Sequence, residues 1–226
     1  EVFAAEAAAL RAMGIAHLMP PVGIMVEVPS VAITPDQMME AAMAVDTGAG
    51  VLFMVKNCDG SVMNFDMASE MASGEGARVI TNDDIAVQDS LYTTGRCVAG
   101  TLVVEKIVGA AEEEGRDLAA LVALGENVNA RTRSMSVALT SCTVPAAGKP
   151  TFDIGSGEME FGVGIHGEPG RRREKLRKAD DIAEEICSGI VAEFGTAKGD
   201  ALLFVNGFGG TPTMELYLVY NSAHRI

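Results

Sequence analysis

His166 has the most distinctive chemical setting of the three histidines in this chain of 226 residues. It follows a predicted strand and lies in the run Gly-Ile-His-Gly-Glu-Pro-Gly at positions 164–170. Glycine permits sharp backbone bends, so Gly164 and Gly167 would leave the imidazole open to a ligand. A neutral imidazole is a competent nucleophile near neutral pH, which makes covalent capture of an electrophile one candidate chemistry. A turn histidine whose ring is bound by backbone groups is the alternative.

A second group of polar residues follows the predicted strand 51–55. Lys56 comes directly after this strand, Asp59 lies in the turn 57–60, and Ser61 can cap the helix expected at 61–72. The glycine turn 207–210 follows another predicted strand, but no Lys-Ser/Thr pair comes after it. We therefore interpret it as a strand-to-helix turn rather than a phosphate-binding loop.

Short apolar strands that alternate with amphipathic helices must position these side chains. Strands are expected at 22–26, 51–55, 78–81, 135–139, 159–165 and 201–205, and helices at about 1–13, from 34, at 61–72, 101–114, 118–129 and 179–194, and from 213. This alternation predicts an α/β fold with a mixed sheet flanked by helices. The polar stretch 170–179 is the best candidate for a domain boundary, so that 171–226 would be a linker and the truncated start of a second α/β domain.

The charge balance argues against two classes of partner. The formal net charge is −14 and the pI is about 4.6, so the chain repels the phosphates of nucleic acid and of anionic membrane surfaces. One basic run, at 171–178, stands against this trend. We interpret it as a solvated loop, with a local anion-docking or protein-docking patch as the alternative.

Cysteine spacing and the lack of targeting signals indicate a cellular compartment. The four cysteines are far apart in sequence and form no C-x-x-C pair, which favours free thiols over a disulfide framework or a zinc site. The sequence shows no basic signal-peptide start and no apolar stretch long enough to cross a bilayer. We therefore expect a soluble cytoplasmic protein without a metal site of its own.

Several motifs occur in one order between about 34 and 224. They are 55–57 with Asn64 and Phe65, 89–96 (Asp-Ser-Leu-Tyr-Thr-Thr-Gly-Arg), 104–106, 143–150 (Thr-Val-Pro-Ala-Ala-Gly-Lys-Pro), 164–170 and 205–212 (Val-Asn-Gly-Phe-Gly-Gly-Thr-Pro). Together they resemble the dihydroxyacetone-binding subunit of dihydroxyacetone kinases. A set of long motifs in one order is far more specific than a single glycine pattern.

The resemblance implies a covalent mechanism. A ring nitrogen of His166 would add to the ketone carbon of dihydroxyacetone, or of a similar short ketose or aldose, and form a hemiaminal. By the same resemblance Lys56, Gly164 and Gly167 would bind the substrate. The alternative for Lys56 is a strand-end lysine that pairs with nearby acids.

The resemblance also implies a partner. This chain would bind no cofactor itself, and a separate subunit carrying ATP or ADP with magnesium would supply the phosphoryl group. Whether that group comes directly from ATP or through a phosphotransferase relay is left open. A homodimer is compatible with the family and with exposed sheet edges.

The sequence departs from the family pattern at three places. Ser61 occupies the position of the family's acid/base aspartate, and Asp59 is the candidate substitute. Serine is a good helix cap but does not accept a proton as a carboxylate does. A glycine-rich loop with a second active-site histidine has no counterpart upstream of residue 34, and Ala32 aligns with a family serine.

The segment 1–33 resembles a different family. Its run Val-Gly-Ile-Met-Val-Glu-Val-Pro-Ser at 22–30 is similar to a helix-strand unit of the phosphoenolpyruvate-binding barrel of enzyme I of the sugar phosphotransferase system. In that family the position of Glu27 binds magnesium. A magnesium site needs several oxygen ligands, so the favoured interpretation is a helix and an edge strand that replace the missing family N-terminus.

Two functions follow from these residues. The first is the substrate-holding part of a dihydroxyacetone kinase. The second is a catalytically impaired binding or regulatory module that captures the ketone at His166 without turnover, which Ser61 and the missing upstream histidine favour. A folded fragment without a site is a third reading, because an open pocket would expose the hemiaminal to water.

Overall fold

The computed structural model describes the central and C-terminal parts of the chain most completely. The described residues are 12–13, 40, 42, 44, 46, 48–57, 61–66, 77–87, 95–141, 143–144, 148–150, 152–165, 168, 170–196, 198–208 and 210–226. The strand expected at 22–26, most of the helices expected at 1–13 and from 34, and Glu27 and Ala32 lie outside them.

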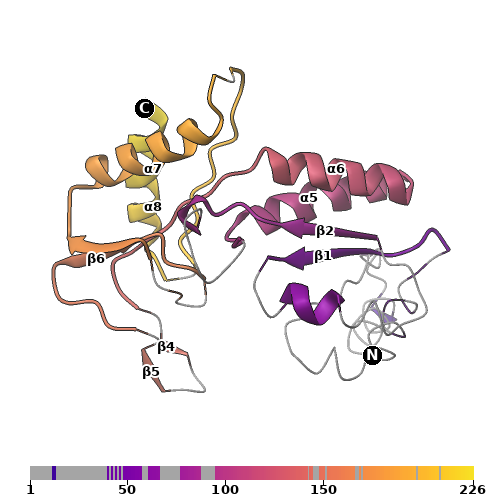
Figure 1. The fold of residues 1–226 in the computed structure, drawn as a ribbon, viewed down its shortest axis with the longest axis horizontal. Coiled ribbons are helices and arrows are strands. Elements are labelled where there is room, and N and C mark those ends of the chain that lie inside the picture. The colour runs from indigo at the N-terminus through magenta and orange to yellow at the C-terminus, as the bar shows by residue number, and fades with distance from the viewer. Residues whose placement is uncertain are drawn as a thin grey trace.

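A parallel pair of strands forms one sheet of the molecule (Figure 1). Strand β1 (Leu52–Lys56) pairs with β2 (Ala77–Thr81), with Lys56 opposite Thr81. Successive side chains of a strand point to opposite faces, and both faces of this pair are apolar, which is typical of buried parallel strands. Both strands were predicted from their apolar runs, and both are confirmed to within two residues.

Helices cover both faces of this pair. On one face Val79 packs with side chains of α5 (Gly100–Glu113) and α6 (Leu118–Ala130). On the other face Val55 packs against Phe65 of the helical segment 61–66. The result is a helix–sheet–helix arrangement with the ends of β1 and β2 at one common edge (Figure 1).

A three-stranded antiparallel sheet is separate from the β1–β2 pair. Its order is β3 (Val137–Ala138), β6 (Glu158–Phe161) and β7 (Arg172–Lys175). Helix α7 (Ala179–Glu193) covers it, because Met159 and Phe161 are fully buried against Ile182. A small hairpin, β4 (Thr143–Val144) and β5 (Lys149–Pro150), extends from this part of the chain.

Strand β6 ends earlier than the sequence pattern predicts. The expected strand 159–165 stops at Phe161, and Gly162 has φ +76°, a value that turns the chain out of the sheet. The chain then leaves β6 as a loop and returns to it at β7. The prediction was too long because the apolar residues 163 and 165 continue the pattern of the strand, although they belong to the loop.

The middle of the basic run, residues 172–175, is a strand rather than a loop, although most side chains of the run are exposed as expected. Strand β7 pairs with β6 along its whole length. The guanidinium of Arg172 lies 4.7 Å, and that of Arg177 5.2 Å, from the ring centroid of Phe161, and both bind Glu185. Cation–π contact and ion pairs therefore hold Arg172 of β7, and Arg177 just after it, against Phe161 of the sheet and Glu185 of α7. The domain boundary expected here stays a prediction, although β6 and β7 pair across it.

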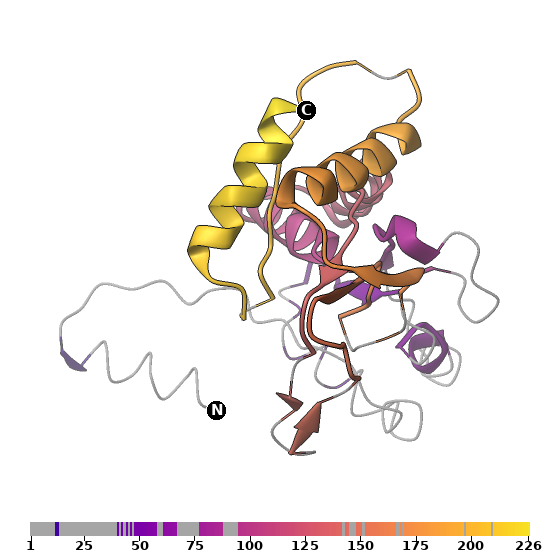
Figure 2. The ribbon, with the colours of Figure 1, turned by 90° about the vertical axis from the view of Figure 1, so that its left-hand side faces the viewer.

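The expected strand at 201–205 has no strand partner among the described residues. The segment has no regular secondary structure, and Leu202 is 81% exposed. The final helix α8 (Thr213–Arg225) packs against α7, where Arg225 binds Asp180 at 2.8 Å (Figure 2). The apolar pattern of 201–205 is that of a strand, but a strand also needs a neighbour for its backbone groups. In the described part of the chain no helix is long and apolar enough to cross a membrane.

Candidate functional site

The candidate site lies where β1 and β2 end. Parallel strands present their carboxyl ends at the same edge, which is where α/β folds bind ligands. Asn57 follows β1 and its backbone amide donates to the Thr81 carbonyl at 3.1 Å, so the pairing continues past Lys56. Lys56 ends β1 and Ser61 begins the helical segment 61–66, and both are half-buried. The paired strands place Lys56 and Asn57 beside Thr81, the residue after which Asn82, Asp83 and Asp84 follow.

Gly95 and Arg96 cross this edge. The backbone amide of Arg96 donates to Asn82 Oδ1 at 3.0 Å. A Cβ atom at Gly95 would lie 2.2 Å from Asn57 Nδ2 and 2.4 Å from Asn82 Oδ1, so any larger residue would displace both amide side chains. Glycine at position 95 therefore lets the chain pass directly over the ends of both strands.

Asp83 anchors the start of α5 from outside that helix. Its carboxylate accepts hydrogen bonds from the backbone amides of Val98 at 3.0 Å and Gly100 at 2.9 Å, and from the hydroxyl of Ser134. Ala99, the residue before the helix, makes no side-chain cap, so Asp83 satisfies amides that would otherwise be orphaned. Burial raises the pKa of Asp83, while the bonds from Val98 and Gly100 act in the opposite direction.

Asp84 forms a buried ion pair with Arg96. The Arg96 Nε donates to Asp84 Oδ2 at 2.6 Å, and the two side chains are only 9% and 0% exposed. The other carboxylate oxygen of Asp84 accepts the Ala86 amide at 2.9 Å. Burial raises the pKa of Asp84, and the amide of Ala86 and the charge of Arg96 oppose that rise.

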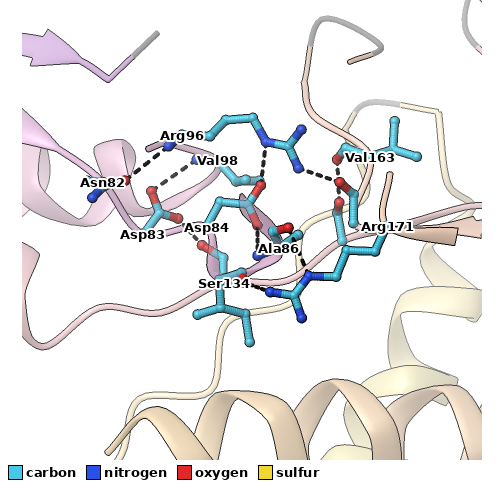
Figure 3. A network of polar contacts seen from close by, with 12 residues as sticks. Asn82, Asp83, Asp84, Ala86, Arg96, Val98, Ser134, Val163 and Arg171 are labelled. Atoms are coloured by element: carbon cyan, nitrogen blue, oxygen red, sulfur yellow. Dashed lines mark hydrogen bonds and ion pairs between the residues drawn. The ribbon is translucent and has the colours of Figure 1, made fainter. Parts of the chain in front are cut away.

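Other segments form hydrogen bonds to the backbone of the chain that enters the His166 loop (Figure 3). Arg96 donates through Nη2 to the Gly162 carbonyl, and the Ser136 hydroxyl donates to the Val163 carbonyl. The Gly162 amide donates to the Ser136 carbonyl at 2.7 Å. Gly164 is buried and donates its amide to the Glu168 carbonyl at 3.1 Å, which joins the two sides of the loop.

The chain that leaves the loop is also held by hydrogen bonds. The Arg171 amide donates to the Phe161 carbonyl at 2.7 Å, and the Gly170 amide donates to Glu160 Oε1 at 2.9 Å. The Arg171 guanidinium donates to the carbonyls of Ala86, at 2.8 Å, and Ile85 (Figure 3). Ile85 and Ala86 belong to the short 3-10 turn η1 (Ile85–Val87) that follows Asp84.

Some of the predicted site residues are among those that the structure describes, and others are not. Lys56 ends β1, Ser61 begins the helical segment 61–66, and Gly164 lies on the entering side of the loop. His166, Gly167 and Asp59 lie outside the described residues, so their roles stay predictions. Within the described residues, no three His, Cys, Asp or Glu side chains gather closely enough to hold a metal ion.

Sequence reasoning missed the residues that organise the loop. Arg96 and Arg171 were seen only as parts of a motif and a basic run, and Asp83 and Asp84 were not singled out. One signal was available: two acids directly after a buried strand are costly to bury unless they have partners. Nothing in the local pattern identifies Arg96 or Arg171 as those partners.

Comparison with known proteins identifies the family. A family model described as the Dak1 domain matches residues 31–226. The chain belongs to the Dak1 family. Dak1 family membership confirms the resemblance given by the motifs between 34 and 224. Residues 1–30 lie outside the match, and the resemblance of 1–33 to enzyme I stays a prediction.

Three relatives of this Dak1 chain illustrate the range of the family. The dihydroxyacetone-binding subunit DhaK of a PTS-dependent dihydroxyacetone kinase from Listeria innocua is 48% identical over 198 residues, which cover 85% of this chain and 60% of that protein. The crystal structure of the dihydroxyacetone kinase of C. freundii has a TM-score of 0.74 at 29% identity, covering 84% of this chain and 35% of that one. The dihydroxyacetone kinase operon co-activator Dha-DhaQ has a TM-score of 0.75 at 32% identity, covering 84% and 61%.

These Dak1 relatives confirm the α/β fold class. They also differ in role, since one is named as a kinase subunit, one as a kinase and one as a co-activator. The chain spans about three fifths of the length of the Listeria innocua subunit, 60% of that protein.

Proposed function

We propose that this chain is the substrate-binding part of a dihydroxyacetone kinase and that it holds the ketone covalently on His166. A ring nitrogen adds to the ketone carbon and the carbon–oxygen π bond breaks. The oxygen takes up a proton, and the imidazole loses the proton of its other nitrogen. The product is a neutral hemiaminal, and every atom of the two reactants is retained. Glycerol, which is similar in size, has no carbonyl and cannot react in this way.

One observation carries the proposal: Gly95 and Arg96 connect the end of β1 to the loop that contains position 166. Position 95 lies against Asn57, the residue after Lys56, and Arg96 donates to the Gly162 carbonyl. The lysine and the loop are therefore parts of one edge, although they are more than a hundred residues apart in sequence. A lysine ammonium at this edge would favour the electron-rich oxygens of a bound polyol.

The phosphoryl step requires a partner. The captured ketone keeps a terminal hydroxyl, which attacks the phosphorus of a donor and releases its proton to a base. We propose that a separate subunit carries the donor nucleotide with magnesium, because the glycine turn 207–210 after a predicted strand lacks the Lys-Ser/Thr of a phosphate-binding loop. The PTS-dependent relative favours a phosphotransferase relay as the source of phosphate. A homodimer is part of the same prediction.

A second function has its own support. Ser61 begins the helical segment 61–66, at the position where the family resemblance places an acid/base aspartate. A serine there leaves capture intact but removes the proton acceptor. The similarity to an operon co-activator fits a chain that binds dihydroxyacetone and reports its presence without phosphorylating it.

The test of capture is a 13C NMR spectrum of dihydroxyacetone labelled at the ketone carbon, with the protein in excess. A new sp3 carbon signal that is absent from the His166→Ala variant is the expected result. Free ketone and its hydrate alone, in both samples, would refute capture by this chain.

The test of turnover uses the same protein with a matched nucleotide-bearing subunit and a phosphoryl donor. Formation of dihydroxyacetone phosphate supports the kinase function. Adduct without product supports the sensor instead, because capture and phosphorylation are then separated.

A further inference from the structure

Both sides of the His166 loop are tied to one short segment, residues 84–86. On the entering side, Asp84 binds Arg96, and Arg96 donates to the Gly162 carbonyl. On the leaving side, Arg171 donates to the carbonyls of Ile85 and Ala86. Asp84 also accepts the Ala86 amide at 2.9 Å, so a single carboxylate connects the two sides (Figure 3).

The burial of this ion pair calls for a reason other than stability. The Arg96 and Asp84 side chains are 9% and 0% exposed, and their desolvation offsets much of their attraction. An apolar pair of similar volume would stabilise the fold at least as well. What the charged pair adds is direction, because the planar guanidinium donates from several fixed positions at once.

The Arg96 guanidinium directs one of its hydrogen bonds to the backbone of the loop. Arg96 donates Nε to Asp84 and Nη2 to the Gly162 carbonyl, so the pair fixes where the chain leaves β6. Its Nη1 lies 3.0 Å from the point where a Cβ of Gly164 would be, and Glu168 Oε2 lies 2.1 Å from the same point. The guanidinium therefore lies against the backbone two residues before position 166.

We propose that Arg96 is a positioning residue for capture of the ketone by His166, and that Asp84 orients Arg96 for this role. The inference rests on the proposed function. Arg96 acts through the loop backbone and not on the substrate. A nucleophile held in reach of its electrophile reacts as if at very high concentration, and a displacement of about 1 Å costs roughly 100-fold.

The test uses a double variant, Asp84→Asn with Arg96→Met, which removes both charges and leaves no buried ion without a partner. Asparagine keeps an oxygen for the Ala86 amide, and methionine keeps most of the arginine's apolar volume. The matched control is Arg177→Met with Glu185→Gln, an ion pair that joins the chain just after β7 to α7.

Two measurements are made on each protein. Amide hydrogen exchange is followed at Gly164 and Arg171, whose amides bind carbonyls across the loop, and at Val104 in α5 as a reporter of the intact fold. The dissociation constant of labelled dihydroxyacetone is obtained from the intensity of the sp3 carbon signal. In the double variant we expect exchange at the two loop amides to rise about tenfold or more while Val104 stays protected. The dissociation constant should rise roughly 100-fold. The control should match wild type in both.

Each other outcome has a defined meaning. Unchanged loop exchange, or faster loop exchange with wild-type affinity, would overturn the positioning role. If wild type forms no adduct, capture at His166 is refuted, and the exchange data alone decide whether the pair holds the loop. If the double variant does not fold, Arg96→Lys replaces it, since lysine keeps the charge beside Asp84 but cannot reach Asp84 and Gly162 together. Wild-type affinity in that variant would also overturn the proposal.

Discussion

Asp83 lies directly against Gly100: its Oδ2 accepts the Gly100 amide at 2.9 Å, and a Cβ at position 100 would come 2.4 Å from the Asp83 Cγ. Any residue larger than glycine at position 100 would therefore collide with the Asp83 carboxylate. Since Asp83 follows β2 and Gly100 begins α5, this contact fixes the helix relative to the end of the strand. The next residue, Asp84, binds Arg96. Two consecutive aspartates therefore hold the start of α5 and the loop.

Removal of this contact should be costly. Asp83→Ala leaves the amides of Val98 and Gly100 buried without an acceptor, and we expect a loss of about 2–4 kcal/mol in the free energy of unfolding. Asp117→Ala is the control, because Asp117 caps α6 at an exposed position by accepting the Ala120 amide at 2.8 Å. Water can replace that cap, so a loss of about 1 kcal/mol is expected. Urea unfolding measures both, and equal losses would contradict the special role of Asp83.

The pH dependence of stability should differ between buried and surface acids. Burial raises the pKa of Asp83 above its ordinary 3.8, against the hydrogen bonds from Val98 and Gly100. The folded state then binds a proton more tightly than the unfolded state. The stabilisation from this group is complete below pH 3.8 and is lost as pH rises through the raised pKa. Relative to Asp83→Asn, wild type should therefore lose stability as pH rises from 4 toward neutral.

Glu185 should behave in the opposite way. Partial burial raises its pKa, but hydrogen bonds from Arg172 and Arg177 outweigh that effect and hold it below the ordinary 4.5. Its stabilisation is present above pH 4.5 and is lost as pH falls through the lowered pKa. Unfolding of wild type and Glu185→Gln between pH 3 and 7 tests this. A difference that stays constant over the range would contradict it.

Two glycines of the helices should respond oppositely to alanine. A Cβ at Gly109 in α5 meets nothing within 4 Å, so Gly109→Ala should stabilise the protein by about 0.5–1 kcal/mol through helix propensity. A Cβ at Gly125 in α6 would lie 2.8 Å from Val79 Cγ2, a fully buried side chain. Gly125→Ala should therefore cost about 1–3 kcal/mol. Thermal unfolding of both variants checks the signs, and a stabilising Gly125→Ala would show that α6 lies farther from β2.

Much of the fold could be predicted from local pattern. The apolar runs gave β1 and β2, and the helical stretches gave α5, α6 and α7 with nearly correct ends. These elements bury their own apolar side chains, so their sequences carry the signal. Segment 201–205 has the apolar pattern of a strand but no strand partner among the described residues, and β7 has the composition of a loop but pairs with β6. In both cases pairing with another segment decides the structure, and local composition does not report it.

The candidate site was predicted only in part, because several of its contacts also join segments that are distant in sequence. The turn after β1 and the glycines around position 166 are local signals. The bond from Arg96 to Gly162 joins residues 66 apart, and that from Arg171 to Ile85 joins residues 86 apart. Each arginine could pair with many acids or carbonyls, and only the folded chain selects among them.

Gly164→Ala should weaken capture with little effect on the rest of the fold. The new Cβ would lie 2.1 Å from Glu168 Oε2 and 3.0 Å from Arg96 Nη1, so both side chains must move. The Glu168 carboxylate is the end of a flexible side chain, and the buried Arg96 guanidinium needs to shift by only a few tenths of an ångström. We therefore expect a loss of stability of about 1 kcal/mol but roughly tenfold or greater loss of affinity for dihydroxyacetone. The 13C adduct signal and urea unfolding together test this. Unchanged affinity would show that the backbone at Gly164 does not set the position of the imidazole.

Ser61→Asp should restore the proton acceptor that the family pattern places at the start of the helical segment 61–66. Aspartate and serine are both good residues at a helix start, so stability should change little. If the chain is a kinase subunit limited by this position, turnover with the nucleotide-bearing subunit should rise about 10²- to 10⁴-fold. Ser61→Asn is the matched control, because asparagine has the same shape but cannot take a proton. Equal rates for the two variants would show that no carboxylate is needed at this position, whereas adduct formation without turnover in both would favour the sensor.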